Sequence, residues 1–427
     1  MQNNYSEATV VLTDARAQFV EIGNHLGTAE CSRSLGDILI MQNNYSEATA
    51  MLTDARAKFI EIGDRSGAAH CSRSLGEILR TQNNYSEANV VLTDAQAQFI
   101  EIGSRLGAAH CSRSLGNILM MQSNYSEATV VLTDARAKFI EIGDHLGTAR
   151  CSQSLGEILQ MQNNYSEATA MLTDARAQFI EIGDRLGAAQ CSQSLGDILR
   201  MQSNYSEATA ILTDARAQFI EIGDRLGAAQ CSRSLGEILR MQSNYSEATA
   251  ILTDARAQFI EIGNRLGAAQ CSQSLGDILR MQSNYSEATA ILTDARAQFI
   301  EIGDRLGAAQ CSQSLGEILR MQSNYSEATA ILTDARAKFI EIGDRLGDAE
   351  CSVSLGAILL SQGNYTEAEK HLVHARDQFI DIAPAPEDGG PPDPDANDAL
   401  ALLDAHVVPQ SRWLLRTSGG GSGRERD

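Results

Sequence analysis

Basic residues are scarce in this sequence: 34 lysines and arginines stand against 55 aspartates and glutamates, and the formal net charge is −21. An acidic protein repels the phosphates of nucleic acids and the headgroups of anionic membranes. The balance therefore argues against nucleic acid and membrane as main partners. It favours a soluble protein, and a protein or peptide partner that carries basic segments.

Aromatic residues outside a repeating pattern are also lacking. The ten tyrosines occupy one repeat position, from Tyr5 to Tyr365, and the ten phenylalanines occupy another, from Phe19 to Phe379. Only Trp413 stands outside this pattern. Aromatic side chains fixed in a core register cannot serve as stacking platforms for bases. Binding of single-stranded nucleic acid is therefore not expected.

Closely spaced cysteines are absent: the nine cysteines, Cys31 to Cys351, recur every forty residues and no CxxC occurs. Disulfides and zinc sites need thiols that converge, so one buried thiol per repeat is expected, with no metal or cofactor. Such thiols suit a reducing compartment. No apolar run nears the ~20 residues that span a bilayer, and the first residues do not resemble a signal peptide. These features predict a soluble cytoplasmic protein.

A fixed period of forty residues dominates the rest of the sequence and predicts one array of stacked units rather than separate domains. In residues 204–222 the apolar positions are spaced alternately by three and four, which predicts an α-helix with one buried stripe. The stripe consists of Tyr205, Ala208, Leu212, Ala215, Phe219 and Ile222.

The ends of two helices are marked in each unit. Asn204 followed by Glu207 predicts a capping box at the start of the first helix. Gly223 predicts its end, because glycine adopts the left-handed conformation at little cost. Asp224 predicts the N-cap of a second helix that runs to about Met241.

The second helix carries a glycine in its middle, Gly236, although glycine costs about 1 kcal/mol relative to alanine there. A cost repeated in every unit predicts close packing, and Ala208 and Ala215 are its expected partners. The residues of this helix expected to be buried are Cys231, Leu235, Ile238 and Leu239.

One pattern makes the unit resemble a known repeat. It consists of L-G-x-x-L followed by Y-x-x-A, L and A, at Leu235, Gly236, Leu239, Tyr245, Ala248, Leu252 and Ala255, and recurs through residues 24–382. The pattern resembles the tetratricopeptide repeat, in the long form of kinesin light chains, Leu-Gly-Asn adaptors and the repeat arms of fungal STAND-type NTPases. Two departures are Ser234 in place of the usual tryptophan and the missing terminal proline.

The resemblance implies an all-α solenoid of antiparallel helix pairs, wound into a right-handed superhelix whose concave groove is lined by the first helix of each motif. The positions that vary most between repeats are those equivalent to residues 230, 233, 237 and 240, here called the variable stripe. They lie on the helix expected at 224–241, which is the second helix of the unit described above and the first helix of a tetratricopeptide motif. The predicted partner-binding groove residues are Gln193, Asp197, Arg200, Gln230, Arg233, Glu237, Arg240, Gln273, Asp277, Arg280, Gln313, Glu317 and Arg320.

Two interpretations of the variable stripe remain open. The stripe could recognise an extended peptide by backbone and charge. Alternatively, Glu237 and Arg240 could pair on a solvated helix face that drifts without a ligand.

Catalytic motifs are lacking, so an enzyme is not expected. GGGSGR at residues 419–424 has neither the lysine nor the strand–helix context of a phosphate loop. His371 and His374 lack a third metal ligand nearby, and a solvated terminal helix is the simpler interpretation. Serines equivalent to Ser232 and Ser234 occur in every repeat, which is not typical of a catalytic nucleophile.

The two ends of the chain differ from the array. Residues 1–23 predict a lone N-terminal helix before nine helix pairs over residues 24–382. An acidic proline-rich linker is expected at 383–396, a short amphipathic segment at 397–416 and a disordered end at 417–427. In the last repeat the variable stripe becomes apolar, at Val353, Ala357 and Leu360. Segments of the tail that could dock on this patch are Leu400, Leu402, Leu403 and Trp413–Leu415.

The sequence thus predicts a non-enzymatic scaffold or adaptor that binds an extended protein or peptide segment in its groove. Two other functions remain open. The chain could be the sensor arm of a STAND-type signalling NTPase, or a structural solenoid that self-associates through the uncapped N-terminal edge.

Overall fold

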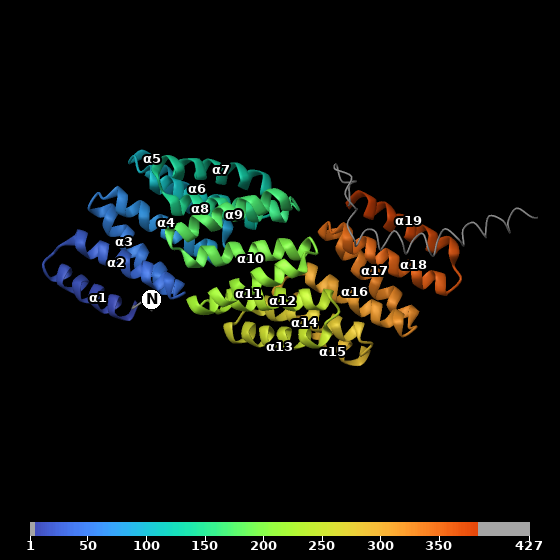
Figure 1. Ribbon diagram of the computed structural model, residues 1–427. Helices are drawn as coiled ribbons and strands as arrows, with labels where there is room; N and C mark the ends of the chain where they lie inside the picture. The colour runs from blue at the N-terminus through green and yellow to red at the C-terminus, as the bar shows by residue number, and fades with distance from the viewer. Residues whose placement is uncertain (1–4, 383–427) are drawn as a thin grey trace, which may run out of the picture. The chain divides into compact units, whose positions relative to one another are not determined.

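The computed structural model describes residues 5–382, and over that range the chain is helical with short connections (Figure 1). The prediction of an all-α fold is confirmed. The helices are α1 (Tyr5–Glu21), α2 (His25–Met41), α3 (Tyr45–Glu61), α4 (Arg65–Thr81), α5 (Tyr85–Glu101), α6 (Arg105–Met121), α7 (Tyr125–Ile142), α8 (His145–Met161), α9 (Tyr165–Ile182), α10 (Arg185–Met201), α11 (Tyr205–Ile222), α12 (Arg225–Met241), α13 (Tyr245–Ile262), α14 (Arg265–Met281), α15 (Tyr285–Ile302), α16 (Arg305–Met321), α17 (Tyr325–Ile342), α18 (Arg345–Ser361) and α19 (Tyr365–Ile382).

The helices belong to two compact units, unit 1 (Met1–Ile222) and unit 2 (Gly223–Asp427). We call the even-numbered helices A helices and the odd-numbered ones B helices. Within each unit, every A helix packs against the B helix that follows it and touches the next A helix. Each unit is therefore a solenoid of antiparallel A–B pairs in which the A helices form one continuous wall.

The core repeats with the sequence, and the predicted apolar stripe is confirmed. In α9, Ala168, Leu172, Ala175 and Phe179 have no exposed surface, and they pack with residues of α8 and α10 in one cluster. All nine cysteines are buried, as expected. The outermost positions of the stripes are only half-buried, as Leu239 shows, because they lie at helix ends.

The predicted packing of the mid-helix glycine against small residues was wrong. A Cβ atom built on Gly236 would lie 2.6 Å from Cγ of Leu252, on the B helix that follows. Gly196 faces Leu212 in the same way. Each glycine therefore packs its backbone directly against a leucine side chain of the next helix, which fills the space that a Cβ atom would occupy.

The predicted junction between a B helix and the next A helix is confirmed. Gly223 has φ +83°, the left-handed conformation that favours glycine. Oδ1 of Asp224 accepts a hydrogen bond of 3.1 Å from the backbone N–H of Gly227, as an N-cap should.

The predicted capping box at the start of the B helix was wrong. Nδ2 of Asn204 donates a 2.8 Å hydrogen bond to Oε2 of Glu207, so the two side chains bond each other. The equivalent Asn244 makes no side-chain cap bond. The residue before it, Ser243, has φ +60°, a left-handed conformation at a non-glycine residue that the sequence analysis did not predict.

The expectations for the linker at 383–396, the amphipathic segment at 397–416 and the disordered end at 417–427 lie outside the described residues. Among the helices at 5–382, none is long and apolar enough to cross a bilayer.

Candidate functional site

The thirteen predicted groove residues all lie on A helices and are all half-buried. Gln193, Asp197 and Arg200 belong to α10 in unit 1. The other ten belong to α12, α14 and α16 in unit 2. The A-helix wall of each unit is thus a partly enclosed polar surface.

The carboxylates and guanidiniums of the variable stripe pair within each helix. The Arg240–Glu237 and Arg320–Glu317 ion pairs are 2.8 Å long. The Arg280 Nε–Asp277 Oδ1 distance is 3.6 Å, and Arg200 and Asp197 repeat it. These pairs have the i,i+3 geometry that the sequence suggested as the alternative to recognition. Their carboxylates are only 14–19% exposed, which is not a freely solvated face.

Side chains of the A-helix wall also bond from one repeat to the next. Ser314, at the repeat position of Ser234, donates a 2.7 Å hydrogen bond to Asp277 of the preceding A helix. Nε2 of Gln273 donates to Oε1 of Gln310 at 3.1 Å. Gln313 donates to Glu350 at 2.8 Å. At Ser314, the serine that replaces the usual tryptophan thus joins its A helix to a carboxylate of the preceding one.

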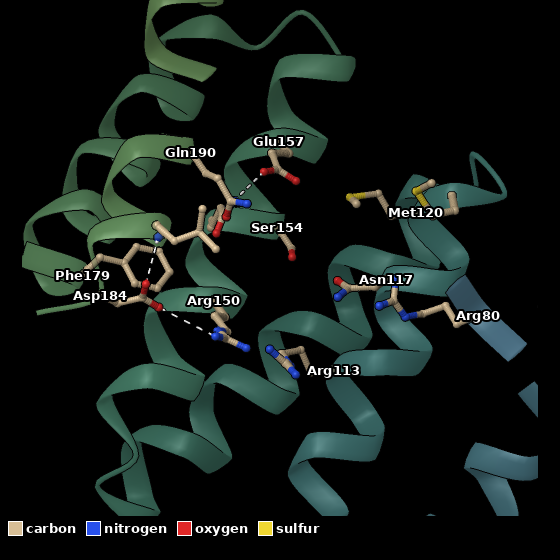
Figure 2. Close-up of a pocket in the computed structure, with 14 residues that line it drawn as sticks. Arg80, Arg113, Asn117, Met120, Arg150, Ser154, Glu157, Phe179, Asp184 and Gln190 are labelled. Atoms are coloured by element: carbon tan, nitrogen blue, oxygen red, sulfur yellow. Dashed lines mark hydrogen bonds and ion pairs between the residues drawn. The ribbon is translucent and has the colours of Figure 1, made fainter. Parts of the chain in front are cut away.

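Unit 1 contains a cavity of about 460 Å³ on its A-helix wall (Figure 2). None of its lining residues is among the predicted groove residues, which lie further along the chain. The lining residues are Arg80, Arg113, Asn117, Met120, Met121, Arg150, Gln153, Ser154, Glu157, Phe179, Asp184, Leu186, Gly187 and Gln190.

One column of the sequence signals this cavity. The seventh letter of the CSRSLGEILR stretch is acidic in most repeats, as in Asp37 and Glu77, but it is Asn117 in α6 and Ala357 in α18. The tenth letter is arginine in Arg80 but methionine in Met120. The charge pairing of the variable stripe is therefore interrupted in α6.

The glutamates on either side of α6 have opposite pKa shifts. Burial raises the pKa of Glu77, but the Arg80 charge at 2.8 Å and a hydrogen bond from Ser114 outweigh it, so the pKa is lowered. Burial raises the pKa of Glu157, and a 2.9 Å hydrogen bond from Gln153 only partly offsets this. No arginine follows Glu157 three residues on, which explains the difference.

The last repeat has its own buried polar cluster. Asp348 is 6% exposed; it accepts a 2.7 Å hydrogen bond from Arg336, and Nε2 of His374 lies 2.8 Å from its Oδ2. Sequence reasoning missed this cluster, although an aspartate at a position usually occupied by alanine was a signal. Among the described residues, no group of three potential metal ligands converges.

The apolar patch of the last repeat is half-buried, at Val353, Ala357 and Leu360. Val353 packs against the cluster formed by Ala349 and two residues of α19. The tail residues expected to dock there lie outside the described part, so the docking stays a prediction.

Comparison with known proteins identifies the family of these helix pairs. A family model for the tetratricopeptide repeat matches residues 107–181, 187–261, 228–301, 266–341 and 309–381, which is more than half of the chain. The chain belongs to the tetratricopeptide repeat family. Stacked tetratricopeptide repeats present extended surfaces of the kind used for protein interactions. No curated protein matches the sequence.

Solved structures share this fold at low sequence identity. The apo form of RapI has a TM-score of 0.61 and 13% identity, over 83% of this chain and 98% of its own. The Rap conjugation gene regulator of plasmid pLS20, in complex with the Phr* peptide, has a TM-score of 0.56 and 13% sequence identity, over 78% of this chain and 95% of its own. A STAND protein with a tetratricopeptide repeat sensor from Pyrococcus horikoshii has a TM-score of 0.56 and 13% sequence identity. That match covers 78% of this chain and 52% of the STAND protein.

Proposed function

We propose that this protein is a non-enzymatic interaction scaffold that holds an extended protein or peptide segment along the A helices. The observation that carries the proposal is the A-helix wall itself. Consecutive A helices touch within each unit, and their half-buried charged and amide side chains bond from repeat to repeat. Regularly spaced polar groups suit a segment read by backbone and charge.

Affinity on such a wall would come from many weak contacts. Each arginine of the stripe gives up a single i,i+3 pair with a carboxylate when it binds a partner. The carboxylate it leaves behind can then bind a basic residue. Loss of one arginine should therefore matter little and loss of four a great deal. The buried thiols and acidic surface suit a cytoplasmic scaffold.

A second candidate is the sensor arm of a STAND-type NTPase, favoured by the fold shared with the Pyrococcus protein. A third is self-association through α1, none of whose residues is buried and whose Val10, Val11 and Val20 are at least 60% exposed. Light scattering over a range of protein concentrations tests the third.

The main proposal is tested by capture of partners from native lysate. The wall variant carries Arg200→Gln, Arg240→Gln, Arg280→Gln and Arg320→Gln. The matched control carries the same change to glutamine at Arg185, Arg225, Arg265 and Arg305. Each of these arginines forms an exposed ion pair with a glutamate at the end of the next helix. Both variants therefore lose four positive charges. A partner retained by the wild type and the control but lost by the wall variant is the expected result. Equal capture by all three contradicts the proposal.

A further inference from the structure

The last B helix, α19, carries two histidines at positions that are not histidine in any other repeat. His371 takes the place of an apolar residue such as Ile331, and His374 takes the place of an aspartate such as Asp334. The A helix before it, α18, has Asp348 where the other A helices have alanine or threonine. Three changes of titratable character therefore coincide in one repeat.

Two of these changes compensate each other. An aspartate at the position of His374 can pair with an arginine of the preceding B helix, as Nη2 of Arg136 lies 3.8 Å from Oδ2 of Asp174. On α19 that aspartate is missing, and Asp348 supplies a carboxylate from α18 instead. Its Oδ1 accepts a 2.7 Å hydrogen bond from Nε of Arg336 on α17, and its Oδ2 lies 2.8 Å from Nε2 of His374. One buried carboxylate therefore joins three consecutive helices.

The other histidine, His371, has no carboxylate to pair with when it is protonated. It is half-buried, and no ion pair among residues 5–382 includes it. The carboxylate one helical turn before it, Glu367, forms a 2.6 Å ion pair with Nζ of Lys370. Both oxygens of Asp348 already have the partners described above. A proton on His371 would therefore add an uncompensated charge to a half-buried cluster.

The pKa of His371 is lowered in the folded chain. Burial is the main cause, the charge of Arg336 adds to it, and Glu367 opposes both. His374 also lowers this pKa. The docked helix therefore binds fewer protons than the undocked helix once the pH falls below the ordinary histidine value of about 6.5. Docking loses stability as the pH falls from that value towards the folded-state pKa, and above that value it is unaffected.

We propose that α19 is a pH-sensitive helix, which undocks from α18 when His371 is protonated. In the docked state α19 and α18 bury an apolar cluster that includes Phe379 and Ala349. Undocking exposes this cluster, so acidification changes the surface at this end of the repeats. The device does not depend on a partner at the A-helix wall, and its failure would leave the scaffold proposal unchanged.

Hydrogen–deuterium exchange of the full chain between pH 7.5 and pH 5 tests this proposal, because it measures local opening of each helix. Exchange rates also depend on pH directly, so the rates of α19 are divided by those of α15, a B helix whose repeat has no histidine. In the wild type this ratio should rise several-fold at pH 5. An ordinary histidine value of 6.5 limits the rise to about thirtyfold. A ratio that does not change with pH overturns the proposal.

Two variants assign the effect to His371. His371→Ile introduces the residue that another repeat has at this position, Ile331, and should abolish the rise of the ratio at pH 5 while α19 stays protected. Glu367→Gln removes the carboxylate that favours the protonated histidine, so undocking should begin at a higher pH. Glu327→Gln makes the same change on α17, away from the histidines, and should behave as the wild type.

The variants can also contradict the assignment. An unchanged pH dependence in His371→Ile would show that another group controls the helix. An equal shift in Glu367→Gln and Glu327→Gln would show that the response follows net charge rather than the surroundings of His371. Either result overturns the proposal.

Discussion

At the scale of single residues, the pKa of a buried glutamate on the A-helix wall depends on the residue three positions further along the helix. Glu77 has Arg80 there, and Glu157 has Gln160. The two glutamates occupy the same repeat position, so the surrounding backbone is nearly the same. They are a natural comparison of a paired and an unpaired buried carboxylate.

Glu157→Gln should raise the melting temperature at neutral pH. Burial raises the folded-state pKa of Glu157, so above that pKa the ionised carboxylate costs stability. As the pH falls through the folded-state pKa towards the unfolded-state value, the cost disappears and the gain of the variant should vanish. Circular dichroism melts between pH 4 and 8 measure this.

Glu77→Gln is the matched control and should have the opposite effect. The pKa of Glu77 is lowered on folding, so its contribution is present above the unfolded-state pKa and is lost as the pH falls through the folded-state pKa. The variant should melt lower than wild type at neutral pH. The same direction of change in both variants would contradict this account.

At the scale of helices, each A–B pair is held by a leucine that rests on a glycine backbone. In the pair α6–α7, a Cβ on Gly116 would lie 2.6 Å from Cγ of Leu132, which has no exposed surface. Helix propensity favours alanine at such a position by about 1 kcal/mol. Overpacking of a tight core costs about 1–3 kcal/mol.

Gly116→Ala should therefore destabilise the chain, by up to about 2 kcal/mol, since the steric cost exceeds the gain in propensity. Urea unfolding measures the change. The double variant with Leu132→Ala should lose less than the sum of the two single changes, because the smaller side chain makes room. Additive losses, or a more stable single variant, would contradict the packing.

Much of this helical organisation could be predicted from the sequence, because it depends on local rules. The spacings of three and four between apolar residues predicted the buried faces of the helices. Gly223 and Asp224 predicted the boundary between a B helix and the next A helix. The left-handed Ser243 was missed, although the same repeat position is Asn43, Asn83 and Asn163 in other repeats, and asparagine favours that conformation. The partner of Gly236 was misjudged because helix–helix register is a tertiary property.

The site was less predictable than the fold. The sequence predicted correctly that the polar residues of the variable stripe lie on the A helices. Their spacing could not show whether the arginines pair with carboxylates of the same helix or are available to bind a partner. The cavity at Arg113 was signalled by a single letter, Asn117, in a column of acids. Its meaning depends on buried atoms of neighbouring helices, which only the three-dimensional arrangement reveals.

At the scale of the whole molecule, the net charge of −21 favours partner segments that carry basic residues. The near-identity of residues 161–340 is consistent with a recent tandem expansion in which the number of repeats is not tuned.

Site-specific photo-crosslinking tests the central claim most directly. A photoreactive benzoylphenylalanine replaces Gln273 on the A-helix wall in one variant, and Ile260 on a B helix in another. Ile260 is 61% exposed and Gln273 is only half-buried, so chance contact favours the B-helix site. We predict that a partner captured from lysate crosslinks to position 273 and not to 260. Crosslinking at 260 alone would contradict binding along the A helices.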